Sequence, residues 1–207
     1  MSDLLYREST TPKYRAMLNW AESTEGLQPI QAPDYHRMQV EHWVYARRGE
    51  LGRFVMDVGQ SDAPRRWVGP GYFTLGLYES DVLGNLISLP VKDGALDGAI
   101  LTEVLEHCTD PSQAVREVHR ALKPGGVLLA TSPFLWPWHG GPSYDDYWRF
   151  TDQGWELLLK DFSRVKISEC EWTDEGNALY DQLRRWECFG ELYDVKATTG
   201  YLVEAWK

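Results

Sequence analysis

The chain of 207 residues has no long apolar run and little cysteine. Its apolar stretches are a few residues each, far below the ~20 that a membrane-spanning helix needs. The polar start MSDLLYREST has no apolar segment of the kind found in signal peptides. The three cysteines are widely spaced and form no C-x-x-C pair, which argues against a disulfide framework and a zinc knuckle. We therefore expect a cytoplasmic protein with no membrane span and no bound metal.

Basic residues are outnumbered. The chain has 21 Lys and Arg against 31 Asp and Glu, a formal net charge of −10 at pH 7. Such a charge works against unassisted binding to DNA or RNA. Arginine pairs at 47–48, 65–66 and 184–185 could each hold a phosphate or a carboxylate, but we interpret them as solvated surface positions. Nucleic acid is not an expected partner, and the sequence leaves a monomer and a homodimer equally open.

Several common site patterns are also absent. There is no G-x-x-x-x-G-K-[ST] phosphate loop, no G-x-S-x-G nucleophile elbow and no H-E-x-x-H helix. Nucleotide hydrolysis on a P-loop, serine-esterase chemistry and zincin-type proteolysis are therefore not expected.

What is present is an alternation of short apolar runs and helical patterns. Runs at 53–58, 72–77, 96–102 and 126–131 read as buried strands. Between the last two, Asp110, Pro111 and Gln113 take the N-cap, N1 and N3 positions of a helix that ends at Lys123-Pro-Gly-Gly126. Strand, helix and strand within about 35 residues form a βαβ unit with parallel strands. The sequence therefore predicts an α/β fold.

The rest of the chain completes one domain. We expect helices at 34–48, 151–160 and 177–193, and strands at 164–170 and 201–206. Residues 1–32 read as an N-terminal arm or a short lid helix, and residues 33–207 as a single domain. We expect segments at about 133–150 and 171–195 to be insertions on the ligand-binding side of that domain.

The main functional signal comes from the loops at the carboxyl ends of the predicted parallel strands, where open α/β sheets bind ligands. A family resemblance is carried by Asp57-Val-Gly59, Leu89-Pro-Val-Lys-Asp-Gly-Ala-Leu-Asp97, Glu103-Val-Leu-Glu106-His107, Asp110-Pro111 and Leu122-Lys-Pro-Gly-Gly126. In this order and spacing they resemble the class I S-adenosylmethionine (SAM) dependent methyltransferases of the type-11 group. The later run Pro133-Phe134, His139 and Asp146-Tyr147-Trp148-Arg149-Phe150-Thr151 is similar to a bacterial subgroup. The resemblance covers about residues 50–170.

The resemblance implies a Rossmann-like, mostly parallel seven-stranded sheet with helices on both faces and a reversed last strand. It also implies SAM as cofactor and S-adenosylhomocysteine as product. Asp57 would order the turn after the first strand, Glu79 would replace the usual acid of the second strand, and Asn85 would face the adenine. The full set of implied cofactor residues is Asp57, Gly59, Ser61, Glu79, Asn85, Leu86, Thr102, Glu103 and His107.

The acceptor side is read from the segment after the fifth strand. Methyl transfer depends mainly on in-line alignment, and an oxygen nucleophile also needs a base. Candidate bases are His139, Asp146 and His107, with His139 first because it lies in a loop rich in proline and glycine. Two alternatives stay open: His139 could simply hold the loop, and Asp145 or Asp146 could pair with Arg149. Candidate substrate residues are Trp136, Trp138, Tyr147 and Arg149.

The predicted function is methyl transfer to a small or carrier-linked acceptor, at oxygen or nitrogen. A different hypothesis is a catalytically silent binding or regulatory protein with an altered SAM site. It rests on Ser61 and Ala63, which stand where relatives have glycine, and on Gly76, which stands where they have the ribose-binding acid. A nicotinamide-dependent oxidoreductase is disfavoured because the first turn has no G-x-G-x-x-G pattern.

Overall fold

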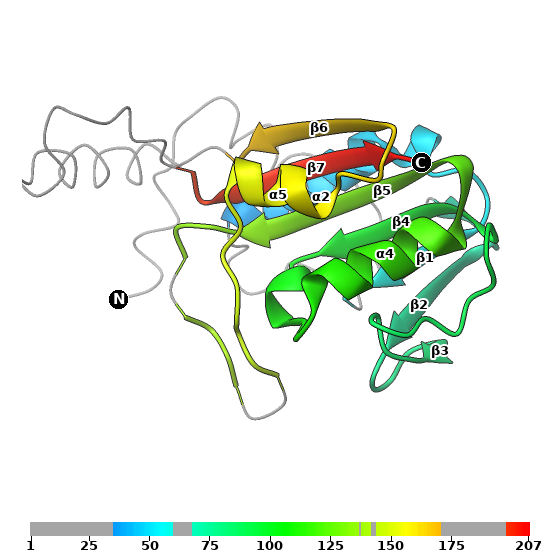
Figure 1. Ribbon diagram of the computed structural model, residues 1–207, viewed down its shortest axis with the longest axis horizontal. Coiled ribbons are helices and arrows are strands. Elements are labelled where there is room, and N and C mark those ends of the chain that lie inside the picture. Colours follow the sequence, from blue (N-terminus) through cyan, green and yellow to red (C-terminus); the bar gives the residue numbers. More distant parts are fainter. Residues whose placement is uncertain (1–34, 60–67, 137, 142–143, 171–197) are drawn as a thin grey trace, which may run out of the picture.

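The structure is a computed structural model that describes residues 35–59, 68–136, 138–141, 144–170 and 198–207. Its centre is a seven-stranded sheet of order β3-β2-β1-β4-β5-β7-β6, in which β7 runs antiparallel to both neighbours and the other pairs are parallel (Figure 1). The strands are β1 (Val55–Val58), β2 (Tyr72–Gly76), β3 (Val82–Leu83), β4 (Leu96–Thr102), β5 (Leu122–Pro133), β6 (Arg164–Glu169) and β7 (Gly200–Trp206). The predicted α/β fold with a reversed last strand is confirmed.

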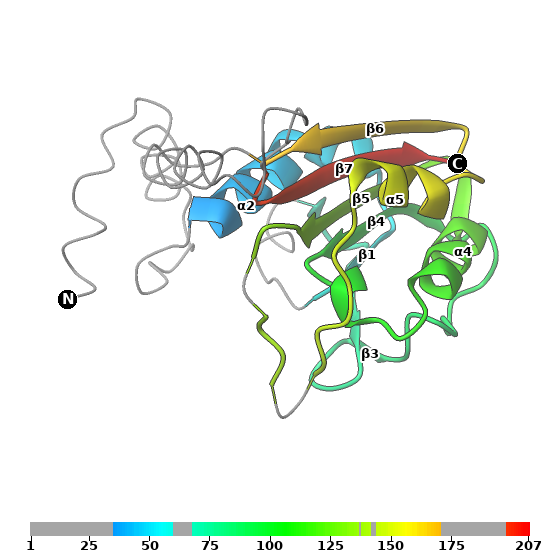
Figure 2. The same cartoon turned by 60° about the vertical axis from the view of Figure 1, so that its left-hand side comes forward.

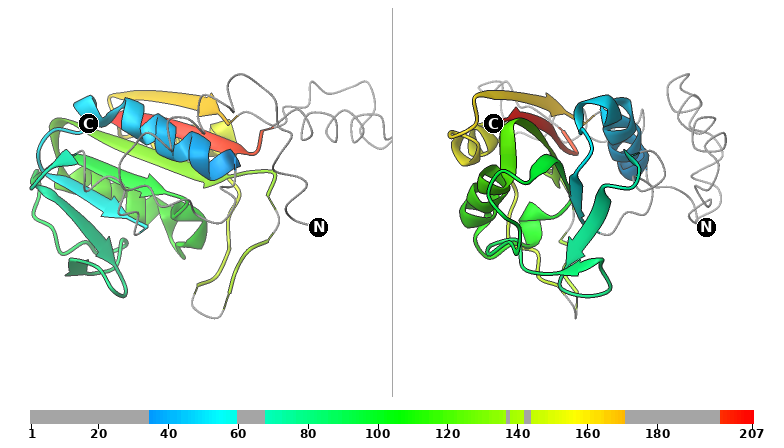
Figure 3. Two further views of the ribbon diagram at one scale, coloured as in Figure 1. Left: turned by 180° about the vertical axis from the view of Figure 1, so that it is seen from behind. Right: turned by 90° about the vertical axis from the view of Figure 1, so that its right-hand side faces the viewer.

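Helices cover both faces of the sheet. Helix α4 (Pro111–Ala121) and helix α5 (Asp152–Leu158) lie on one face, and α2 (Tyr35–Ala46) lies on the other (Figure 3). Each face has its own apolar core. Trp155 of α5 is fully buried in the first core, and Trp43 of α2 packs in the second. Single-turn helices η2 (Arg48–Glu50) and η3 (Leu105–His107) precede β1 and follow β4.

Helix α4 begins where its capping residues predict. The Asp110 carboxylate accepts a hydrogen bond from the backbone N–H of Gln113 at 2.8 Å, and Pro111 occupies the first turn, where its missing N–H costs nothing. The apolar stripe of α4 faces the sheet and is buried. Helix α5 is capped in the same way, because Thr151 Oγ1 accepts from the N–H of Gly154 at 3.0 Å.

The boundaries of the fifth strand differ from the prediction. Leu122 already pairs with Leu96, and the register shifts before Val127 pairs with Gly98. The Lys-Pro-Gly-Gly sequence therefore forms an irregular first part of β5 instead of a loop, as happens at bulges. Strand β3 was not predicted, because a two-residue strand is too short to leave a pattern.

Other expectations are tested only in part. The expected helix at 177–193 and the arm at 1–32 lie outside the described residues. None of the helices in the described part of the chain is long and apolar enough to cross a bilayer.

The cap of α4 can be tested directly. Asp110→Ala removes the acceptor for an N–H group that has no partner within the helix, and we expect it to lower the free energy of unfolding by about 0.5–2 kcal/mol. Urea denaturation followed by circular dichroism measures the change. Ser112→Ala, at an exposed position in the same turn, is the control and should change the free energy by no more than about 0.5 kcal/mol. Equal losses in the two variants would contradict the capping role.

Candidate active site

The register of the sheet brings the ends of three strands together. Val58 at the end of β1 pairs with Leu75 of β2 on one side and with Leu101 of β4 on the other. The loops that follow these strands therefore leave the sheet at the same edge. This is the edge at which open parallel sheets bind ligands.

Gly59 makes the turn after β1 in a conformation that disfavours other residues. Its φ is +124°, and a Cβ at this position would lie 3.2 Å from the carbonyl oxygen of Thr102 and from a methyl group of Val104. Glycine therefore allows the loops after β1 and β4 to approach closely. The next predicted cofactor residue in this turn, Ser61, lies outside the described residues.

Asp57 holds the end of β1 to its neighbour. Its side chain is fully buried, and one carboxylate oxygen accepts a hydrogen bond from the Tyr72 hydroxyl at 2.6 Å. Tyr72 begins β2, so the contact fixes β1 against β2 below the turn. That Asp57 also orders the turn after β1 stays a prediction.

The end of β2 is crowded by the side chain of Ser80. A Cβ at Gly76 would lie 2.5 Å from the hydroxyl of Ser80, so the chain folds back over this position. Glu79 follows in a left-handed conformation with φ +41°, and it is exposed. Beyond it, Asn85 Oδ1 accepts from the N–H of Ile87 at 3.1 Å, whereas Leu86 is buried in the core. Of the predicted residues here, Glu79 and Asn85 face solvent, but Leu86 does not.

The loop after β4 is tied to β5. Glu103 has φ +55°, and its backbone N–H donates to Thr131 Oγ1 at 3.1 Å. In return, the Thr131 hydroxyl donates to Glu103 Oε1 at 2.7 Å. This reciprocal pair holds an unfavourable backbone conformation immediately before η3.

Three side chains converge just beyond that point. Glu106 and His107 belong to η3, and His139 comes from the segment after β5. Glu106 Oε1 lies 3.6 Å from His107 Nε2 and 4.0 Å from His139 Nε2, and the two imidazole centroids are 5.1 Å apart. The structure therefore brings together the predicted residues His107 and His139, and it adds Glu106.

The Glu106 carboxylate is in an unusual environment. Its side chain is fully buried, and neither oxygen has a hydrogen-bond partner among the described residues. Loss of hydration, helped by the negative charge of Glu103, raises the pKa of Glu106 to about 9. A buried carboxyl group without partners is costly to a fold and marks candidate functional sites.

Asp146 organises the segment that carries His139. Its carboxylate is buried, pairs with the Arg149 guanidinium and accepts from the backbone N–H of His139 at 3.0 Å. Its Oδ2 also lies 3.2 Å from His139 Nδ1. The Arg149 hydrogen bonds are the main reason that the pKa of Asp146 is well below its usual range. The Asp146–Arg149 pair of the alternative reading is present, and its role in fixing the loop stays a prediction.

The same segment docks onto η3 through its backbone. In Figures 1 and 2 the chain between β5 and α5 leaves the sheet in a long excursion before it returns to α5. The N–H of Tyr147 donates to the carbonyl of Glu106 at 2.8 Å, and His107 Nδ1 lies 2.5 Å from the carbonyl oxygen of Asp145. The indole N–H of Trp148 donates to the carbonyl of Cys108 at 2.8 Å.

The predicted substrate residues all lie on this segment, but they differ in exposure and in their contacts. Trp138 is 73% exposed, and Trp136 and Tyr147 are also exposed. All three side chains thus have surface that faces solvent. Arg149, in contrast, uses its guanidinium on Asp146 and on backbone carbonyls, including that of Trp148 at 2.7 Å. Its predicted role as an anion grip is not what the contacts indicate.

The chain resembles known methyltransferases in sequence. A family model described as a methyltransferase domain (Methyltransf_11) matches residues 66–130. A probable SAM-dependent methyltransferase from Mycolicibacterium smegmatis is 44% identical over 50 residues, 24% of this chain and 20% of that protein. The ubiquinone biosynthesis O-methyltransferase of Pseudomonas paraeruginosa is 26% identical over 143 residues, which span 58% of this chain and 60% of that protein.

Solved structures give the fold. The 1,6-didemethyltoxoflavin-N1-methyltransferase of Burkholderia thailandensis, in complex with its substrate and S-adenosylhomocysteine, has a TM-score of 0.57, with 15% identity over 94% of this chain and 89% of that chain. The fold is that of the class I SAM-dependent methyltransferases. The resemblance stated from the loop motifs is confirmed, and the edge formed by β1, β2 and β4 is the candidate cofactor side of this methyltransferase fold.

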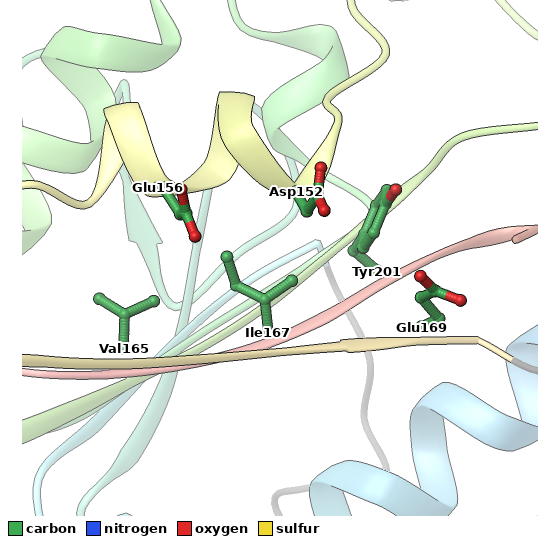
Figure 4. Close-up of a pocket in the computed structure, with 6 residues that line it drawn as sticks. All are labelled: Asp152, Glu156, Val165, Ile167, Glu169 and Tyr201. Carbon is green, nitrogen blue, oxygen red and sulfur yellow. The ribbon is translucent and has the colours of Figure 1, made fainter. Parts of the chain in front are cut away.

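A separate hollow lies elsewhere on the domain. A cavity of about 260 Å³ is open between α5 and the strands β6 and β7, and its lining includes Asp152, Glu156 and Glu169 (Figure 4). Figure 4 shows the carboxylates of α5 above Val165 and Ile167 of β6. None of the predicted site residues lines this cavity.

Glu106 belongs to the sequence motif that ends at His107, but the sequence did not predict it as a site residue. The pattern that could have found it is the spacing of Glu106 and His107 directly after a buried strand. What the pattern does not contain is the contact with the returning chain, where the N–H groups of Tyr147 and Trp148 donate to the Glu106 carbonyl.

The Asp146 contacts predict a large effect of a small change. Asp146→Asn keeps the shape but removes the charge that Arg149 and His139 share, and we expect the free energy of unfolding to fall by about 1–3 kcal/mol. Chemical denaturation measures the loss. Asp145→Asn is the matched control, since its exposed side chain contacts the Tyr147 hydroxyl. A loss in the Asp145 variant as large as in the Asp146 variant would contradict the special role of Asp146.

Proposed function

We propose that the chain transfers a methyl group from SAM to a hydroxyl oxygen of a small or carrier-linked acceptor. The observation that carries the proposal is the position of the Glu106, His107 and His139 cluster beside the candidate cofactor edge of a methyltransferase fold. Groups that can remove or hold a proton stand immediately after the strand that a methyl donor would contact.

The residues at the edge fit a methyl donor. Gly59 leaves backbone groups accessible at the end of β1, as a cofactor that lies against the chain requires. Glu79 is exposed after β2 and can accept hydrogen bonds from ribose hydroxyls, which Gly76 cannot. Thr102 and Glu103 bound the same edge from β4. Asn85 offers a polar side chain further along this rim.

The chemistry asked of the protein is modest. When bound, SAM supplies a methyl group that its sulfonium already activates. The residues of this chain must then exclude water, align the acceptor and take its proton. His139 is the proposed base, because Asp146 orients its ring and its second ring nitrogen faces the cluster.

A hydroxyl acceptor is favoured over an amine by the same cluster. An alcohol or phenol is a weak nucleophile until its proton is removed, so it gains most from adjacent bases. The exposed aromatic side chains Trp136, Trp138 and Tyr147 lie on the segment that carries His139, where an acceptor could pack against them. The Pseudomonas paraeruginosa relative is named as an O-methyltransferase, which supports the choice.

Binding of the product analogue tests the cofactor edge. Gly59→Ala introduces strain at φ +124° and crowds Thr102, so we expect at least a tenfold weaker affinity for S-adenosylhomocysteine by isothermal titration calorimetry. Gly94→Ala is the matched control, because Gly94 also has a positive φ but nothing lies within 4 Å of its Cβ position. If the unmodified protein does not bind the compound at millimolar concentration, the methyltransferase hypothesis is refuted. The hypothesis of a catalytically silent protein with an altered SAM site then remains. Equal weakening in both variants would refute the role of Gly59.

The acceptor side predicts a different pattern. His139→Ala should lower the turnover of methyl transfer by about 10²–10⁴-fold, the usual contribution of a positioned base. Its affinity for S-adenosylhomocysteine should stay within about threefold of the unmodified protein. Acceptors for this assay come from mass spectrometry of extracts incubated with methyl-labelled SAM. Equal losses of cofactor affinity in the His139 and Gly59 variants would contradict this division of roles.

A further inference from the structure

The geometry of the cluster points to a metal site: we propose that Glu106, His107 and His139 bind one divalent first-row transition-metal cation such as Zn²⁺ or Co²⁺. One donor atom from each of these three residues lies within 4.8 Å of the other two. The sequence alone predicts no metal, because its cysteines form no C-x-x-C pair and it has no H-E-x-x-H helix.

The distances suit an ion better than they suit hydrogen bonds. At 3.6 and 4.0 Å, neither imidazole Nε2 atom is within hydrogen-bonding range of Glu106 Oε1. Two ligand atoms that each lie about 2.1 Å from one ion can be at most about 4.2 Å apart. Both measured separations fall below that limit. The two imidazole donor atoms lie within 4.8 Å of each other, so a bound ion requires them to approach slightly.

The protonation of the two rings points in the same direction. His107 Nδ1 lies against the carbonyl oxygen of Asp145, which can only accept, so this nitrogen donates. His139 Nδ1 faces the Asp146 carboxylate, which also accepts. In a neutral imidazole the remaining nitrogen, Nε2, then presents a lone pair. Both lone pairs and the Glu106 carboxylate meet in one place, where a cation removes the repulsion.

These outer contacts are those that metal-binding histidines usually make. A ligating imidazole commonly donates its other N–H to a carboxylate or a backbone carbonyl, which fixes the tautomer and the ring. Here a carbonyl serves His107 and a carboxylate serves His139. Arg149 in turn holds Asp146, so the second layer of the site is already built.

The burial of Glu106 is a second observation, separate from the convergence of the three donor atoms. Its side chain has no exposed surface, and both oxygens lack a hydrogen-bond partner among the described residues. Buried charges in proteins are normally paired or coordinate a metal. A cation between the two imidazoles gives this carboxylate the partner that the described chain does not.

The donor set selects the kind of cation. Two imidazole nitrogens and one carboxylate oxygen suit zinc and its first-row neighbours, whereas Mg²⁺ and Ca²⁺ prefer sites made of oxygen. Three protein ligands leave at least one position open, as in catalytic rather than structural zinc sites. The open position can take water or a substrate oxygen.

The use of the ion rests on the proposed function. A hydroxyl bound at the open position loses its proton more easily, because the cation lowers its pKa. That proton passes to solvent, the oxygen forms its bond to the methyl carbon, and the S–CH₃ electron pair returns to sulfur, which gives S-adenosylhomocysteine. In the loaded protein His139 is then a ligand, and the cation takes over the work of the base.

Metal binding is tested without any activity assay. The full chain is stripped with a chelator, dialysed against Zn²⁺ and analysed for metal content, and Co²⁺ is titrated with its visible absorption as the signal. We expect about one ion per chain. Glu106→Gln, His107→Ala and His139→Ala should each weaken binding at least tenfold, and Asp146→Asn should weaken it about 10–100-fold by releasing His139. His42→Ala, at an exposed position on α2, is the control and should bind normally.

The outcomes separate the metal from the methyltransferase activity. No bound Zn²⁺ or Co²⁺, equal binding by the Glu106 and His42 variants, or binding of Mg²⁺ alone would each overturn the site. Glu106→Gln should fold without metal, because it loses a buried charge, and circular dichroism checks this. S-adenosylhomocysteine titrated into the stripped protein reports on the cofactor edge alone. If the protein binds S-adenosylhomocysteine but no metal, only the metal site is refuted. If it binds metal but no S-adenosylhomocysteine, only the proposed function is refuted.

Discussion

Parallel pairing of β1, β4 and β5 is the constraint on which the candidate site depends. It places Gly59, Thr102 and Glu103 at one edge, and it brings the segment after β5 across the loop after β4. Hydrogen bonds between the two loops then fix them: Glu103 with Thr131, and Tyr147 with the carbonyl of Glu106. Without this register, the donor edge and the imidazole cluster would not be neighbours.

The buried Glu106 carboxylate is costly in this arrangement. Burial without hydrogen bonds disfavours its charged form, and the nearby Glu103 adds to this effect. The nearby Arg149 guanidinium relieves only part of this cost, because it is hydrogen-bonded to Asp146. A protein that keeps such a group in place needs either a proton on it or a cation beside it. The two imidazoles aimed at the same point favour the cation.

Much of the fold could be predicted because each signal is local. Asp110 and Thr151 cap their helices with contacts to residues three positions later, and the strand at 96–102 was placed with its observed bounds. The irregular start of β5 was missed, since Gly125 and Gly126 read as a turn, whereas their backbone groups bond to the distant Lys207. Two-residue β3 has no pattern of its own.

The sequence predicted most of the residues of the candidate site but not their individual roles. His107, His139 and Asp146 were chosen from their loops, and the structure brings them together. Their individual roles depend on contacts between distant segments. Arg149 was expected as a possible grip for substrate, but its partner Asp146 lies within the same turn of chain. Leu86 was expected at the cofactor, but the apolar core takes its side chain. Glu106 was passed over because burial by a returning loop leaves no trace in the local sequence.

The central claim is that the edge formed by β1, β2 and β4 binds a methyl donor. Hydrogen–deuterium exchange of the full chain with and without S-adenosylhomocysteine tests it most directly. We predict slower exchange in peptides that contain Gly59, Glu79 and Thr102, with little change over α5 and β6. Protection confined to the α5–β6 hollow, or none anywhere at saturating ligand, would contradict the account.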